Sequence, residues 1–125
     1  MRIPPPDPAP DLESYVLREV LLAVAAVPGV VAWRQNSGLY YAPDGRGGFR
    51  RVRAAMPGCA DILGWVRLGS LAAFLALEVK TQTGRTRPEQ REFLAAVRDS
   101  GGLAAVVRSP EEAVEAIRAF REANQ

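Results

Sequence analysis

The sequence predicts an α/β domain in which helices flank a central mixed β-sheet. Apolar residues recur at helical spacing from Leu12 to about Val27, and two apolar segments, 60–68 and 71–80, are separated by a Gly-Ser pair. A helical segment, a short apolar strand and a last helix follow, so the expected order is α-β-β-β-α-β-α. A chain of 125 residues is most simply one domain.

The first ten residues are expected to form an extended arm ahead of a single domain spanning 11–125. Proline stands at positions 4, 5, 6, 8 and 10, and such a run cannot sustain a helix. Asp11 can then cap the first helix, which Pro28-Gly29 ends. The apolar segment Val30–Arg34 reads as the first strand.

A polar stretch rich in glycine and arginine, 35–56, separates this strand from the next apolar segment. Turn residues fill it, so we expect a flexible loop or a ribbon. Further along, Gly69-Ser70 suits a two-residue hairpin turn. That turn pairs residues whose numbers add up to 139, which places Trp65 opposite Phe74 and Asp61 opposite Glu78.

The facing pair of acids is the most informative consequence of this register. Directly opposed residues have Cβ atoms about 5 Å apart, and two like charges at that distance destabilise a sheet. A divalent cation between Asp61 and Glu78 would compensate for the repulsion. Because both strands are apolar on both faces, they are expected in the middle of a sheet covered by helices, where unused carboxylates are costly.

The remaining elements follow from turn and capping residues. Pro88 suits the first position of a helix that runs to about Ser100. Gly101-Gly102 ends it, and the apolar segment 103–107 is a short strand. Ser109, followed three residues later by Glu112, has the spacing of a capping box for the last helix.

The composition excludes several kinds of catalytic, disulfide and metal site. The chain has no histidine and one cysteine, Cys59, so it can have neither a histidine-based catalytic relay nor a disulfide within the chain nor a cysteine-cluster zinc site. A reducing cytoplasm, of a bacterial cell or of the host of a phage, is the expected compartment, and no apolar run is long enough for a membrane span. The net charge of +2 indicates little about partners by itself.

Lys80 is the only lysine of the chain, and it follows Glu78 by two residues. Residues two apart on a strand project from the same face. The simplest interpretation is a structural ion pair at a strand end. Asp61, placed opposite Glu78 by the hairpin register, favours a site for metal-assisted phosphodiester cleavage instead.

These residues form a recognisable pattern: Gly58-Cys59-Ala60-Asp61, then Glu78-Val79-Lys80, then Gln90 in a helix that Gly101-Gly102 ends. The pattern resembles the PD-(D/E)xK nuclease superfamily, whose core is restriction-endonuclease-like, and within it the virus-type replication-repair nuclease (VRR-NUC) family. The likeness extends from Glu13 to about Ile117. Ala60 occupies the position where the superfamily motif has proline. This difference does not remove a metal ligand.

The resemblance implies a role for each site residue. Asp61, Glu78 and the backbone carbonyl of Val79 would bind Mg²⁺ or Mn²⁺. Lys80 would orient the attacking water or stabilise charge on the phosphate, a task for which arginine is a poor substitute. Gln90 would position Lys80 or a water. Glu13 matches the first-helix acid of the family and could hold a metal-bound water or a second ion, with Glu19 as the competing candidate.

Some of these residues also have a purely structural interpretation. Glu13 suits the first turn of any helix, and Gln90 could be a surface glutamine. Cys59, Trp33, Trp65 and Phe74 are expected to be packing or core residues.

The expected partner is DNA, contacted by arginines that lie in the loops flanking the acids. These are Arg34, Arg46, Arg50, Arg51, Arg53, Arg85 and Arg87. The family likeness points to branched substrates such as Holliday junctions, whose two symmetric cuts imply a homodimer, with the last helix or the proline-rich arm as possible contact. Two other functions stay open: a DNA-binding or assembly module that does not cleave, and a nuclease acting on flapped or linear duplex DNA.

Overall fold

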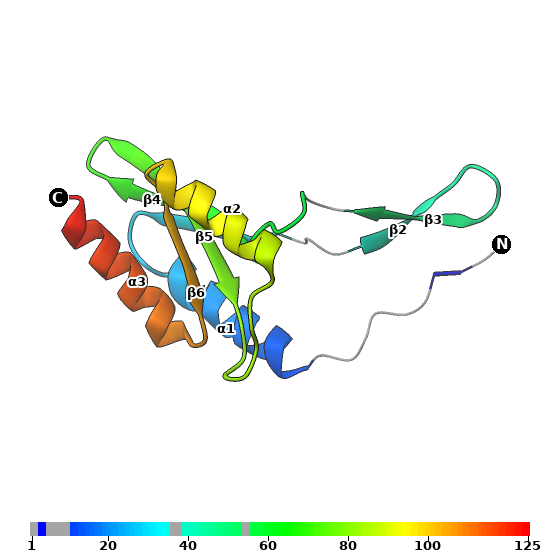
Figure 1. The fold of residues 1–125 in the computed structure, drawn as a ribbon, viewed down its shortest axis with the longest axis horizontal. Helices are drawn as coiled ribbons and strands as arrows, with labels where there is room; N and C mark the ends of the chain where they lie inside the picture. Colours follow the sequence, from blue (N-terminus) through cyan, green and yellow to red (C-terminus); the bar gives the residue numbers. More distant parts are fainter. Residues whose placement is uncertain (1–2, 5–10, 36–38, 54–55) are drawn as a thin grey trace.

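The structure, a computed structural model, describes residues 3–4, 11–35, 39–53 and 56–125. Three helices and six strands follow one another along these residues (Figure 1). They are α1 (Leu12–Ala25), β1 (Val30–Arg34), β2 (Leu39–Pro43), β3 (Phe49–Arg53), β4 (Ile62–Leu68), β5 (Leu71–Val79), α2 (Pro88–Asp99), β6 (Leu103–Val107) and α3 (Pro110–Ala123). Without β2 and β3, the order is the predicted one.

The central sheet has four strands in the order β1-β4-β5-β6. The first two neighbouring pairs are antiparallel and β5 runs parallel to β6, so the predicted mixed sheet is confirmed. Leu68 pairs with Leu71 and Trp65 with Phe74, as the hairpin turn predicted. Gly69 in that turn has φ +60°, a conformation that suits glycine. The last paired position before the acids is Ile62 with Leu77, so Asp61 and Glu78 lie one step beyond the ladder.

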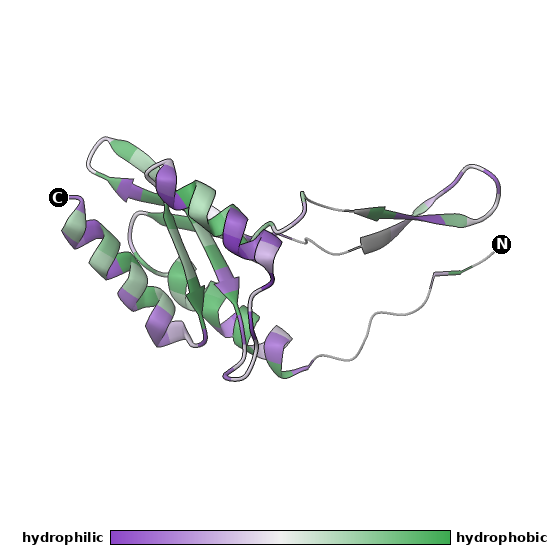
Figure 2. Cartoon of the chain, in the orientation of Figure 1, coloured by the Kyte–Doolittle hydropathy of each residue, from purple (hydrophilic) through white to green (hydrophobic). Residues whose placement is uncertain are grey.

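The two faces of the sheet are covered unequally. On one face, α1 and α3 bury Leu17, Val20 and Ile117 against the inward side chains of all four strands. On the other face, α2 buries Leu94 and Val97 against β5 and β6. Figure 2 shows the apolar stripes of the helices against a largely apolar sheet. Burying one such side chain contributes about 1.5 to 3 kcal/mol, so these stripes hold the layers together.

The predicted helix starts are confirmed. Asp11 accepts a hydrogen bond from the Ser14 N–H at 2.8 Å, and Ser109 accepts one from the Glu112 N–H at 3.1 Å. Each satisfies a backbone donor that the first turn of a helix leaves without a partner.

The prediction that Trp33, Trp65 and Phe74 lie in the core is wrong. Their exposed fractions are 41%, 43% and 44%. All three lie on the face that α2 covers, but α2 leaves the part over β1 and β4 open, where Trp33 and Trp65 lie. Phe74, near the hairpin end of β5, pairs with Trp65 at the edge of this open part. Trp33 and Trp65 pack edge to face there, with ring centroids 6.0 Å apart.

The polar stretch after β1 contains a ribbon, which was one of the two expected forms. Strands β2 and β3 pair with each other, antiparallel, and form a second sheet of their own. Figure 1 shows this ribbon extending away from the layers of the central sheet. Most of the proline-rich arm lies outside the described residues. None of the described helices is long and apolar enough to cross a membrane.

Candidate active site

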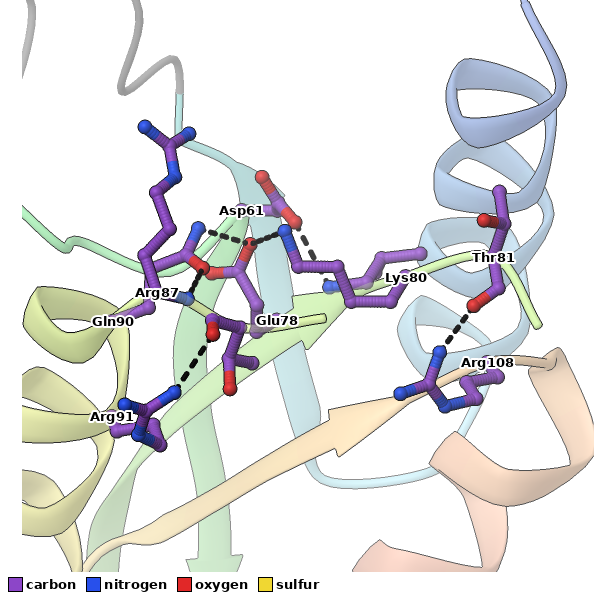
Figure 3. Close-up of polar contacts among 10 residues, drawn as sticks. Asp61, Glu78, Lys80, Thr81, Arg87, Gln90, Arg91 and Arg108 are labelled. Carbon is purple, nitrogen blue, oxygen red and sulfur yellow. Dashed lines mark hydrogen bonds and ion pairs between the residues drawn. The ribbon is translucent and has the colours of Figure 1, made fainter. Parts of the chain in front are cut away.

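Asp61 and Glu78 meet where β4 begins and β5 ends (Figure 3). The Asp61 carboxylate accepts a hydrogen bond from the Val79 N–H at 2.9 Å. The Asp61 carbonyl accepts another from the Gln35 N–H at 2.7 Å, just after β1. Asp61 therefore continues the strand pairing with its side chain, and hydrogen bonds from two neighbouring chain segments fix its position.

Glu78 is the buried member of the pair, with an exposed fraction of 2%. Its Oε1 accepts a hydrogen bond from Gln90 Nε2 at 3.2 Å and lies 3.6 Å from Lys80 Nζ. Its Oε2 is buried and has no hydrogen-bond partner among the described residues. A buried carboxylate oxygen in this state has lost its water without replacing it, which is unfavourable unless another group binds there.

The pKa of Glu78 is raised to about 8, and burial is the largest cause. The neighbouring Asp61 carboxyl acts in the same direction, while Lys80 acts in the opposite direction. The two carboxylates are thus too close to be charged together without additional positive charge.

Lys80 is held in place through the backbone on both sides of it. Its N–H donates to the Val107 carbonyl at 3.0 Å, and the Arg108 guanidinium donates to the carbonyl of Thr81. The Lys80 side chain is only 11% exposed. Sequence reasoning missed Arg108; the parallel pairing of Val79 with Val107 is what brings it beside the loop after Lys80.

Gln90 links the helix α2 to the acids. Its Oε1 accepts a hydrogen bond from the Arg87 N–H at 2.8 Å, which caps the start of the helix, and its Nε2 donates to Glu78. Gln90 is buried rather than a surface residue. Among the described residues, its side chain hydrogen-bonds Glu78 and not Lys80, so it orients the acid.

The backbone at Gly58 packs directly against the first turn of α2. A Cβ atom at this position would lie 2.1 Å from the Glu89 carbonyl oxygen, and φ is +79°, so only glycine fits. Cys59 is buried, as expected for a packing residue. Burial raises the pKa of its thiol, and the charges of Glu78 and Asp61 raise it further.

Glu13 is exposed and does not join the acid pair in this structure. It lies in the first turn of α1, on the helix face that buries Leu17 and Val20. That turn lies near the end of β5 (Figure 1). Glu19 points from a different face of the helix. Among the described residues, no group of three acidic, histidine or cysteine side chains is close enough to bind a metal together.

The predicted DNA-binding arginines fall into two sets. Arg34 ends β1 directly before Gln35, and Arg85 and Arg87 lie in the loop between Lys80 and α2. These three flank the acids, and Figure 3 shows the Arg87 side chain extending beyond Gln90. The others belong to the ribbon: Arg46 lies in its turn, and Arg50, Arg51 and Arg53 belong to β3.

The family model of the VRR-NUC domain matches residues 44–111, more than half of the chain. The chain belongs to the VRR-NUC family. The match includes Asp61, Glu78, Lys80 and Gln90 and excludes Glu13. Membership in the VRR-NUC family implies a nuclease of the PD-(D/E)xK type with DNA as its substrate, and the predicted fold class is confirmed. No curated protein matches the chain.

Proposed function

We propose that this VRR-NUC protein is a metal-dependent, structure-specific endonuclease that hydrolyses phosphodiester bonds of branched DNA such as Holliday junctions. The observation that carries the metal dependence is the partnerless Oε2 of Glu78, buried beside the Asp61 carboxylate.

The residues present fit Mg²⁺ or Mn²⁺, which prefer oxygen ligands. Asp61 and Glu78 would hold the ion together with the carbonyl of Val79. In an extended strand the C=O of a residue points to the same side as its N–H, and the Val79 N–H points to Asp61. When bound, such an ion polarises the phosphate and favours ionisation of a water.

The chain's own groups supply the remaining parts of the reaction. Gln90 holds Oε1 of Glu78, and Lys80 lies against the same oxygen, so Oε2 stays available for a ligand. The ammonium of Lys80 can donate to an attacking water or to a phosphate oxygen, because it has three donors and is fixed near the acids. We propose that Glu13, rather than Glu19, holds a water at this end of the sheet.

A homodimer is part of this proposal, since one chain has one acid pair and a four-way junction is resolved by two symmetric cuts. The open sheet face supports it. Val31, Trp33, Trp65 and Phe74 are each more than two-fifths exposed there. Beside them is a groove of about 470 Å³, which Leu71, Phe74 and Val97 help to line. A two-fold interface requires a projection and a recess on the same surface, and this face has both.

The cleavage test uses labelled four-way junction, flap and linear duplex DNA with Mg²⁺, Mn²⁺ or EDTA. We expect symmetric cuts in the junction with either metal, none in EDTA, and none with Asp61→Ala. Preferred cleavage of flap or linear DNA would overturn the branched-substrate proposal. Binding without cleavage under every condition would favour a non-cleaving module.

The dimer test substitutes Trp65→Glu and compares it with Leu22→Glu, which places the same charge on an exposed apolar position of α1. Sedimentation analysis of the wild type and of Leu22→Glu is expected to give dimers, and that of Trp65→Glu folded monomers, with circular dichroism as the check on folding. A dimeric Trp65→Glu variant would contradict the assignment of this face.

A further inference from the structure

The excess positive charge of the chain lies in the ribbon formed by β2, β3 and their turn, residues 39–53. It contains four arginines and one acid, a net charge of +3, whereas the whole chain has +2. The rest of the chain is therefore at −1, with both signs interspersed. A charge excess concentrated in one element marks the surface that meets a polyanion.

The hydrophobic core does not explain the ribbon. Neither of the two core clusters contains a residue from β2 or β3 among the described residues. An isolated two-stranded hairpin is marginally stable in water. A partner outside the core is the natural source of further stabilisation.

The turn of the ribbon is nevertheless well defined. The Asp44 carboxylate accepts hydrogen bonds from the N–H groups of Arg46 at 2.7 Å and Gly48 at 3.1 Å. The Asp44 N–H donates to the Gly48 carbonyl at 3.1 Å. Asp44 is thus used to shape the turn, which leaves Arg46 exposed at the tip.

The arginines of the ribbon point in several directions. Arg50 and Arg51 are consecutive on β3, so they project from opposite faces, and both are exposed. Among the described residues, neither they nor Arg46 form an ion pair, whereas Arg118 on α3 binds Glu115 and Glu122. A ribbon lying flat on one phosphate backbone would need cations on one face only. Cations on both faces and at the tip suit insertion between two backbones.

We propose that this ribbon enters the major groove of a duplex arm next to the cleavage point. The major groove, about 12 Å wide, admits a two-stranded ribbon, whereas the minor groove of undistorted DNA is only about 6 Å wide. The proposal rests on the proposed function, because it takes duplex DNA as the substrate.

The position of the ribbon in the chain connects it to the acids. It follows Gln35, whose N–H donates to the Asp61 carbonyl, and it precedes the Gly58–Asp61 segment. Since Arg46 lies in the turn beyond β2, the chain from Leu39 to Arg46 spans at most roughly 23 Å, its length if fully extended. That length corresponds to about seven base pairs, so the ribbon contacts DNA within about one helical turn of the cut.

The test compares the triple variant Arg46→Gln, Arg50→Gln, Arg51→Gln with a control that removes the same charge from α1 and α3: Arg18→Gln, Arg118→Gln, Arg121→Gln. Binding to a four-way junction is measured in EDTA across a range of salt concentrations. The affinity of the wild type should fall as the salt concentration rises. We expect the ribbon variant to make the plot of log K against log salt less steep, by up to about 3 in slope, since each phosphate contact contributes about 0.9. The control should keep the wild-type slope.

A second readout locates the contact. Wild-type protein should protect guanine N7, a major-groove atom, from dimethyl sulfate within about one turn of the cut. The ribbon variant should lose this protection. Equal slopes for the two triple variants, or no N7 protection by the wild type, would overturn the proposal.

These outcomes are separable from those for the proposed function. If the wild type cleaves and the ribbon variant binds like the wild type, the ribbon proposal fails alone. If the wild type does not cleave but protects N7 and loses this with the ribbon variant, the nuclease assignment fails and the ribbon proposal stands.

Discussion

Lys80→Ala is expected to slow cleavage of bound DNA about 100- to 1,000-fold, the effect typical of losing a fixed donor beside developing negative charge. Lys80 is the only ammonium side chain, and it lies 3.6 Å from Glu78 Oε1. Lys80→Arg should restore little, because a guanidinium is planar, larger and never deprotonated. The measurement is a single-turnover rate with Mg²⁺ at saturating protein.

Arg85→Ala is the matched control, because it removes one positive charge from the loop that follows Lys80. We expect it to weaken DNA binding while the rate at saturation stays within a few-fold of the wild type. Lys80→Ala should bind DNA nearly normally. Cleavage by Lys80→Ala within tenfold of the wild-type rate would remove Lys80 from the site.

In EDTA, the free energy of unfolding is expected to fall by a few kcal/mol as the pH rises from 5 to 9. The pKa of Glu78 is about 8 in the folded protein and 4.5 ordinarily. Between these values the folded chain keeps a proton that the unfolded chain has released, so the stabilisation is complete below pH 4.5 and is lost as the pH rises through 8. Each pKa unit corresponds to about 1.4 kcal/mol. Thermal unfolding in EDTA and in Mg²⁺ measures this, and Mg²⁺ should raise the melting temperature most at high pH.

Two variants isolate the acid pair within this pH dependence. Glu78→Gln removes the titrating group, so its melting temperature should change less between pH 5 and 9. Asp61→Asn removes the neighbouring charge and can still accept the Val79 N–H, so it should melt at a higher temperature than the wild type in EDTA at pH 8 to 9. An unchanged or lower melting temperature for Asp61→Asn would contradict the repulsion between the acids.

Much of the fold and the proximity of the acids could be predicted from the sequence, because both follow from local rules. Gly69 fixes the hairpin turn, and the turn fixes which residues face each other, from Leu68 with Leu71 up to the acids. Helix starts were predictable at Asp11 and Ser109, since their side chains bond to backbone groups three residues away. Such interactions depend on spacing along the chain alone.

Features that depend on the packing of distant elements were not predictable. Trp33 and Trp65 are large apolar residues of the kind usually found in a core. They are nevertheless exposed, because α2 packs over β5 and β6 and does not reach across β4 and β1. Arg108 reaches the Thr81 carbonyl only because β6 pairs with β5 in parallel. The buried position of Gln90 depends likewise on where α2 docks.

The contact between Gly58 and the Glu89 carbonyl limits how much the site rearranges during a reaction. Backbone atoms in contact have no rotamers, so the loop that leads to Asp61 and the helix that carries Gln90 cannot drift apart by side-chain motion. The donor that orients Glu78 is therefore already in place before DNA arrives. A site assembled in this way needs little reorganisation energy when a phosphate enters it.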